Sequence, residues 1–183
     1  MKKIFFVYIF IIFSNNVFSI ENQEKELNRL FSELKNTNNN LSAKEIETKI
    51  WKLWSTHPSK PNLTDLLAQG SYFMSQNQLT TANKVFSKAI ELDPKWAEAW
   101  NKRATVLYLM GNYELSQNDI DVVLNLEKRH FGALAGQGLV QTALNNYQKA
   151  INSYKEVEKI YPSMESPKLM IPKLKELIRK KSI

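Results

Sequence analysis

Apolar residues recur at helical spacing along most of the chain. Between residues 21 and 35, one helical face carries the apolar residues Leu27, Leu30, Phe31 and Leu34. After an Asn-rich break, Ser42 and Glu45 have the spacing of a capping box, which predicts the start of a second helix. The apolar face of this second helix carries Ile46, Ile50, Trp51 and Trp54. Prolines follow it, so the pattern predicts an N-terminal helical pair over residues 20–60.

The next part of the chain is periodic. Pro94 and Pro162 lie 68 residues apart, which is twice 34, and Lys128 stands at the midpoint. If these residues are position 32 of a unit, the units are 63–96, 97–130 and 131–164. Small residues then recur at position 8 (Gly70, Ala104, Gly138) and at position 20 (Ala82, Ser116, Ala150). Large residues recur at position 24, as Phe86, Ile120 and Tyr154.

These shared positions have a direct physical meaning. Small residues are needed where the two helices of a unit cross closely, and large residues fill the space between helices. A proline at position 32 stops the second helix of a unit. Each unit is therefore expected to be an αα-hairpin, and stacking of the hairpins is expected to build one core. An ordinary helix bundle is the alternative, but it does not explain the shared period.

The pattern resembles the tetratricopeptide repeat, whose signature is W-x2-L-G-x2-Y, then A-x3-F, then P. Ala82, Phe86 and Pro94 match this signature, as do Ala150, Tyr154 and Pro162. The departures are Ser116 for alanine, Lys128 for proline, and leucine replaced at Arg103 and Gln137. The resemblance implies an all-α, αα-hairpin solenoid of three repeats within residues 61–164.

A capping helix is expected to close this solenoid over residues 165–183. Ser166 and Pro167 are helix-start signals, and Pro172 is expected to move the actual start to about its own position. The apolar stripe of the segment consists of Met170, Leu174, Leu177 and Ile178.

The first 19 residues have the pattern of a signal peptide. Lys2 and Lys3 precede an unbroken apolar run over residues 4–13, and Ser19 suits cleavage after it. The run is shorter than the ~20 apolar residues that cross a bilayer. We therefore expect a periplasmic or secreted protein, with a retained membrane anchor as the alternative. The chain has no cysteine, so it is not a lipoprotein and has no disulfide.

The formal net charge of +7 is concentrated near the C-terminus. Residues 163–183 carry six basic side chains against two acidic ones, and the rest of the mature chain is close to neutral. A nucleic-acid interface would spread its basic residues over a binding face, so nucleic acid is not expected as a partner. A basic helix that contacts a membrane surface or another polyanion weakly is an alternative function.

No set of residues predicts catalysis, a metal site or a cofactor. The two histidines, His57 and His130, lie in no metal-binding motif. We expect His57 to be solvated and His130 to complement the end of the preceding helix. Asp119 and Asp121 are two residues apart in one helix and point to different faces. The sequence therefore predicts a protein that is not an enzyme.

The resemblance implies that the first helix of each unit lines a concave groove that holds a peptide or a partner helix. Carried onto this sequence, the groove residues are Leu67, Ser71, Glu98, Asn101, Lys102, Thr105, Tyr108, Gly132, Gly136 and Leu139. A subgroup of the family that clamps acidic chaperone tails is not matched. Lys102 stands where that subgroup has asparagine, and Gly132 and Gly136 replace its basic pair. The expected function is a protein–protein scaffold or adaptor of the cell envelope, of unassigned oligomeric state.

Overall fold

The apolar stripes of the sequence form helices throughout residues 20–181, the part of the chain that this computed structural model describes. Within that range every regular element is an α-helix and no strand occurs. The predicted signal peptide, residues 1–19, lies outside the described residues. In residues 20–181, no helix combines the length and the apolar character needed to span a membrane.

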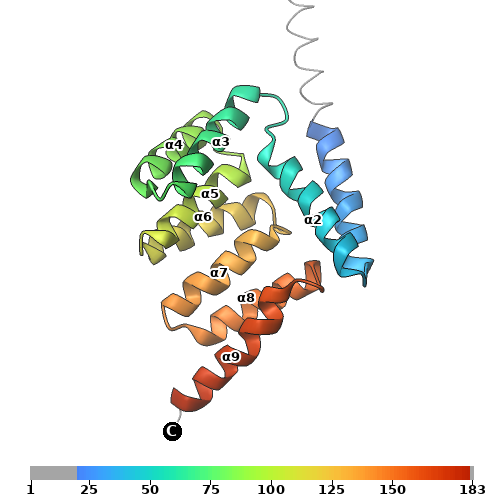
Figure 1. The fold of residues 1–183 in the computed structure, drawn as a ribbon, viewed down its shortest axis with the longest axis vertical. Helices are drawn as coiled ribbons and strands as arrows, with labels where there is room; N and C mark the ends of the chain where they lie inside the picture. Colours follow the sequence, from blue (N-terminus) through green and yellow to red (C-terminus); the bar gives the residue numbers. More distant parts are fainter. Residues whose placement is uncertain (1–19, 182–183) are drawn as a thin grey trace, which may run out of the picture. The chain divides into compact units, whose positions relative to one another are not determined.

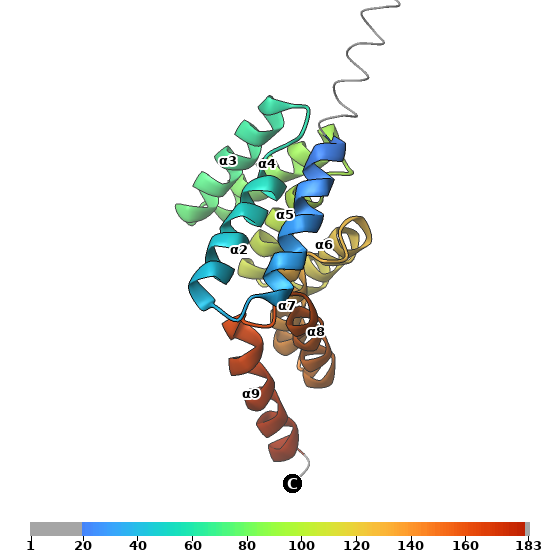
Figure 2. The same ribbon diagram turned by 90° about the vertical axis from the view of Figure 1, so that its right-hand side faces the viewer.

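The chain divides into two compact units, Met1–Thr64 and Asp65–Ile183, which are described separately. The first unit contains a helix over residues 20–36 and α2 (Asn40–Ser55), which lie side by side (Figures 1 and 2). Phe31 and Trp54 join the two helices with ring centroids 5.7 Å apart. Gln23 also donates its amide hydrogens to the carbonyl groups of Leu53 and Thr56. The predicted N-terminal helical pair is present.

The start of α2 differs from the prediction. Asn39 is the N-cap, and its Oδ1 accepts the backbone N–H groups of Leu41 at 2.9 Å and Ser42 at 3.1 Å. The predicted capping box at Ser42 and Glu45 is therefore wrong. Asn39 caps as well as serine does, and because it comes first the helix begins three residues earlier.

The second unit is a stack of helical hairpins. Its helices are α3 (Pro61–Ser75, which begins in the first unit), α4 (Leu79–Leu92), α5 (Ala97–Leu109), α6 (Tyr113–Leu126), α7 (Phe131–Ala143), α8 (Tyr147–Ile160) and α9 (Glu165–Lys181). Figure 1 shows α4 to α9 following one another in chain order. Within hairpins, α5 packs on α6 and α7 on α8; between hairpins, α4 packs on α5 and α6 on α7. The predicted all-α solenoid of three αα-hairpins is confirmed.

The turn inside each hairpin repeats with the period of the sequence. Asn77, Gly111 and Asn145, which are 34 residues apart, have φ angles of +56°, +78° and +59°. These angles are in the left-handed region, which glycine and asparagine tolerate best. The next N–H in each turn bonds back to the preceding helix, as between Asn112 and the Leu107 carbonyl at 2.9 Å. This regularity was not recognised in the sequence.

The expected need for small residues at position 8 is confirmed. A Cβ atom on Gly70 would lie 2.5 Å from the ring of Phe86. A Cβ atom on Gly138 would lie 2.6 Å from the ring of Tyr154. In the middle unit Ala104 shares a core cluster with Ile120 instead. Positions 8 and 24 thus form pairs, in which glycine faces an aromatic ring and alanine faces a smaller aliphatic side chain.

The departures from the family signature have local partners. Arg103 donates from Nε and Nη2 to the two Oδ atoms of the buried Asp119, both at 2.7 Å. Gln137 stands at the same position of the next unit, and its Oε1 accepts the Ser153 hydroxyl at 2.8 Å. In the second and third units, position 23 (Asp119 and Ser153) therefore supplies the polar partner of position 7.

Lys128 replaces proline in a turn that does not require proline. The Glu127 carbonyl accepts the His130 N–H at 3.1 Å, just as the Asp93 carbonyl accepts the Trp96 N–H at 3.2 Å around Pro94. Proline presets the φ angle of the second turn residue, but most residues can adopt that angle.

Helix α9 covers the last hairpin, as expected of a cap. Leu174 is fully buried and packs with Ala150, Ile151 and Tyr154 of α8. The helix begins at Glu165 and contains Pro172, so the prediction that it starts near this proline is wrong. Pro172 is exposed, so water can solvate the carbonyl that loses its helical hydrogen bond, and packing on α8 maintains the helix on both sides.

Candidate partner-binding site

A hollow of about 60 Å³ lies between α5 and α7. Six of the ten predicted groove residues line it: Asn101, Thr105, Tyr108, Gly132, Gly136 and Leu139. Ser116 and Ile120 of α6 also line it, together with Ala104, Ala133 and Val140. We call this place the α5–α7 hollow. It joins residues of two consecutive repeats, which the sequence could group only through the family resemblance.

The two walls of the α5–α7 hollow differ in chemistry. Helix α5 provides the polar groups at Asn101, Thr105 and Tyr108, whose spacing places them along one side of a helix. Helix α7 (Phe131–Ala143) carries no charged residue along its whole length. Gly136 leaves open space on this wall, because a Cβ atom there would meet only Ile120, at 3.8 Å. The hollow therefore has a polar wall, an uncharged wall and a mostly apolar floor.

A buried polar network lies beside the hollow and links α5 to the start of α7. Glu98 is 1% exposed, and its Oε2 lies 3.0 Å from His130 Nε2. Asn101 Nδ2 donates to the same oxygen at 3.0 Å. Lys102 Nζ lies 3.3 Å from Glu98 Oε1. The carboxylate is thus held by neutral donors on one oxygen and by a cation on the other.

The position of the imidazole proton follows from the contacts of His130. Its Nδ1 accepts the backbone N–H of Ala133 at 3.1 Å, and a backbone amide can only donate. The ring proton therefore lies on Nε2 and is donated to Glu98. Burial raises the pKa of Glu98, but the His130 hydrogen bond and the charge of Lys102 outweigh burial and hold that pKa below its ordinary value.

The sequence missed this role of His130. We expected it to complement the end of the preceding helix, whereas it caps the start of α7 and pairs with Glu98. The available signal was its place directly before a predicted helix, where a side-chain acceptor serves as N-cap.

The other predicted groove residues lie outside the hollow. Leu67 is 3% exposed, so its side chain belongs to the packed interior rather than to a surface. Ser71, also on α3, donates its hydroxyl to the Leu67 carbonyl at 2.9 Å. Glu98 is buried beneath the hollow, and Lys102 is partly exposed at its edge.

His57 is buried, so the expectation that it is solvated is wrong. Its Nδ1 accepts the backbone N–H groups of Ser59 at 3.2 Å and Lys60 at 3.0 Å, in the loop before α3. Both histidines therefore organise backbone at a helix start. In the part of the chain that the structure describes, no three His, Asp or Glu side chains are grouped to hold a metal ion.

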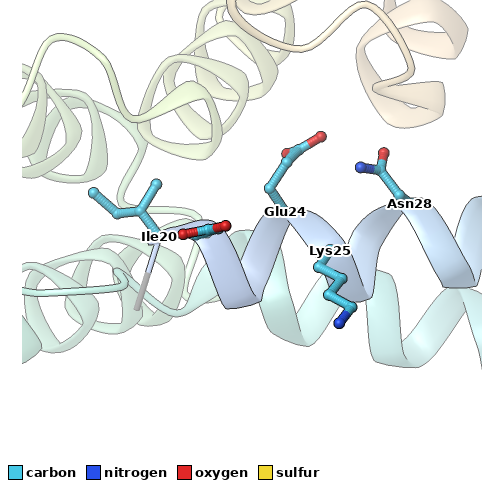
Figure 3. Close-up of a pocket in the computed structure, with 5 residues that line it drawn as sticks. Ile20, Glu24, Lys25 and Asn28 are labelled. Carbon is cyan, nitrogen blue, oxygen red and sulfur yellow. The ribbon is translucent and has the colours of Figure 1, made fainter. Parts of the chain in front are cut away.

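A second surface depression lies along the helix over residues 20–36. Figure 3 shows Ile20, Glu24, Lys25 and Asn28 on this one helix, with Glu24 and Asn28 projecting from the same side. All of them are exposed. The residues named for this depression come from a single helix, whereas α5, α6 and α7 together line the α5–α7 hollow.

Comparisons with known proteins match this architecture. Family models described as "TPR repeat" and "Tetratricopeptide repeat" match residues 70–111 and 132–164. A TPR repeat-containing protein of Rhizobium etli is 34% identical over 140 residues, which are 76% of this chain and 68% of that relative. Three further curated relatives match as well, and the chain spans less than a quarter of each of them.

Solved structures show the same fold at low sequence identity. The first TPR of Spaghetti, solved with the HSP90 peptide SRMEEVD, is 17% identical with a TM-score of 0.62, over 64% of this chain and 93% of that chain. The Sgt2 TPR domain of Aspergillus fumigatus is 17% identical with a TM-score of 0.64, over 67% of this chain and 83% of that chain.

Proposed function

Because the chain belongs to the family of tetratricopeptide-repeat proteins, we propose that it is a scaffold without enzymatic activity that holds another protein or a peptide. The observation that carries this proposal is the α5–α7 hollow, where two repeats bring polar and apolar groups together around an open space. Solenoids of stacked hairpins use such extended surfaces for binding.

A solved relative gives a precedent for a peptide partner. The first TPR of Spaghetti is described as bound to an HSP90 peptide, SRMEEVD, which carries three acidic residues. An acidic tail of that kind does not suit the hollow of this chain. Lys102 is already paired with Glu98, and α7 offers no positive charge. We therefore propose a protein or a peptide as the partner, but not an acidic tail.

The binding role is tested by cross-linking in the native cell, followed by capture of the chain. Asn101→Ala, Gly136→Leu and Tyr108→Ala together change three lining residues of the hollow and should abolish the main cross-link. Glu91→Ala is the matched control, because Glu91 lies on the exposed side of α4 and, among residues 20–181, forms an ion pair only with Lys88. A cross-link that survives the triple change while the fold is retained would place binding elsewhere.

The cell envelope is the proposed location. Its support is the N-terminal pattern of two lysines followed by the apolar run of residues 4–13. Cell fractionation and N-terminal sequencing of the mature protein test it, and a chain that begins at Ile20 outside the cytoplasm is the expected result. An uncut cytoplasmic product would contradict the location but not the binding role.

The basic face of α9 supports a second candidate, weak contact with an anionic membrane surface. Lys168, Lys173, Lys175 and Arg179 are exposed, while the apolar face of the helix packs on α8. Such contact would be electrostatic, at about 1 kcal/mol per basic residue near the surface. In vesicle flotation, Lys173→Gln, Lys175→Gln and Arg179→Gln together should release the chain from anionic vesicles without uncovering Leu174. Equal flotation of both forms would exclude this candidate.

A further inference from the structure

The side-chain amide of Asn101 has a fixed orientation, and its Oδ1 is available to accept a hydrogen bond. The Asn101 side chain is 7% exposed and lines the α5–α7 hollow. Nδ2 donates to Glu98 Oε2 at 3.0 Å, and a flip of the amide would set two oxygens against each other. Among the described residues, nothing donates to Asn101 Oδ1. This acceptor is available at the wall of the hollow, so the hollow suits a ligand that brings an N–H group.

The polar wall favours an extended ligand over a helical one. In a helix the interior N–H groups are already bonded to the helix itself, so they cannot serve Asn101. An extended chain leaves alternate N–H groups free on one side. Asn101 and Tyr108 are seven residues apart on α5, which is about 10 Å along the helix axis. That distance corresponds to about three residues of extended chain.

The charges around the hollow favour an uncharged ligand. An acidic group at Asn101 would face an amide oxygen that has the Glu98 carboxylate behind it. A basic group would approach Lys102, whose charge already compensates Glu98. Helix α7 offers no charge to either kind of ligand.

The space in the hollow limits the size of the side chain that enters it. Its volume is about 60 Å³. Ile120 and Val140 line it, and Gly136 keeps it open. An alanine or valine side chain suits this space, whereas an aromatic ring exceeds it.

From these observations we infer that the α5–α7 hollow recognises an extended, uncharged segment of a partner chain. One backbone N–H of the segment is donated to Asn101 Oδ1, and the adjoining small aliphatic side chain lies over Gly136. Glu98 and His130 act as positioning residues that hold the amide in its orientation. This inference rests on the proposed scaffold function and narrows it, because it replaces the choice between peptide and helix by an extended peptide.

The test is selection from a random-peptide phage library. Each insert continues into further polypeptide at both ends, so no insert ends in a free C-terminal carboxylate. The bait is the purified full chain. We expect enrichment of uncharged inserts with an alanine or valine anchor. A synthetic peptide of the enriched sequence should bind about tenfold more weakly when the anchor amide is N-methylated, because the donated hydrogen is lost.

Variants of the chain complete the test. Gly136→Ala and Gly136→Leu should weaken the peptide in that order while thermal unfolding shows a stable fold. Asn101→Ala should also weaken it and should abolish the effect of N-methylation, which a merely structural role would not do. Glu91→Ala is the matched control.

Enrichment of acidic, aromatic-anchored or helical inserts, or of none, would overturn the inference. So would peptide binding that is indifferent to Gly136→Leu. None of these results would touch the scaffold function, because that is judged separately by the cross-link in the native cell.

Discussion

Two glycines of α7, Gly136 and Gly138, give a sharp test of the packing argument, because they share a helix but face different surroundings. Replacing either by alanine should gain about 1 kcal/mol of helix propensity. At Gly136 the new Cβ atom meets Ile120 Cδ1 at 3.8 Å, an ordinary contact, so this gain is kept. At Gly138 the Cβ atom would lie 2.6 to 2.9 Å from three ring carbons of Tyr154. Tyr154 is only 1% exposed, so its ring is enclosed by other residues.

Overpacking of this kind typically costs 1–3 kcal/mol, and the number of close contacts places Gly138→Ala near the upper end. We therefore expect Gly136→Ala to raise the free energy of unfolding by up to about 1 kcal/mol. We expect Gly138→Ala to lower it by about 1 to 2 kcal/mol, since the propensity gain offsets part of the strain. Urea unfolding followed by far-UV circular dichroism measures both changes.

The double variant Gly138→Ala, Tyr154→Ile provides the control, because it copies the pairing of Ala104 with Ile120 in the middle repeat. It should recover part of the stability lost by Gly138→Ala alone. If Gly138→Ala were as stable as Gly136→Ala, or if the double variant recovered nothing, the pairing of positions 8 and 24 would not control the packing of this hairpin.

Four further predictions concern single sites. The stability contributed by Glu98 should be fully present above its ordinary pKa of 4.5 and be lost as pH falls through the lowered pKa of the folded state. Glu98→Gln should therefore reduce the loss of unfolding free energy at acid pH. Arg103→Leu should cost about 3 kcal/mol, because it leaves Asp119 buried without its partner, and Arg103→Leu with Asp119→Val should recover most of that loss in urea titrations. Gly111→Ala should cost about 1–2 kcal/mol from its positive φ alone, since nothing crowds the new methyl group; calorimetry would measure the lower melting temperature. Burial raises the pKa of Tyr154 to about 12. This phenol should therefore stabilise the fold fully below pH 10 and lose that contribution as pH rises toward 12. Tyr154→Phe should remove this dependence of the unfolding free energy on alkaline pH.

The repeat architecture was predictable because close packing constrains residue size directly. Gly70 and Gly138 are small for a reason that recurs in every unit, and the spacing of Pro94 and Pro162 fixes the frame. Six groove residues could likewise be assigned to one hollow, since the family frame places α5 beside α7. Features that repeat with the period were thus accessible from the sequence.

Features that depend on one pair of side chains were not accessible. Glu98 and His130 are 32 residues apart. Nothing in the sequence indicates that their side chains are buried and in contact. In the sequence, Arg103 in place of leucine is only a departure from the family signature. The structure shows its partner, Asp119. Local competition also misled the prediction at α2, where Asn39 and Ser42 are equally good caps and only the folded backbone decides between them.

The pairing of positions 8 and 24 also restricts how this chain can be rearranged by recombination. A crossover in a loop between hairpins, such as the one at Lys128, moves Gly138 together with Tyr154 and leaves every pair intact. A crossover in the turn inside a hairpin would join the first helix of one unit to the second helix of another, and Ala104 would then face an aromatic ring. Whole hairpins are therefore the units that can be duplicated, lost or exchanged, while a single helix is tied to its partner.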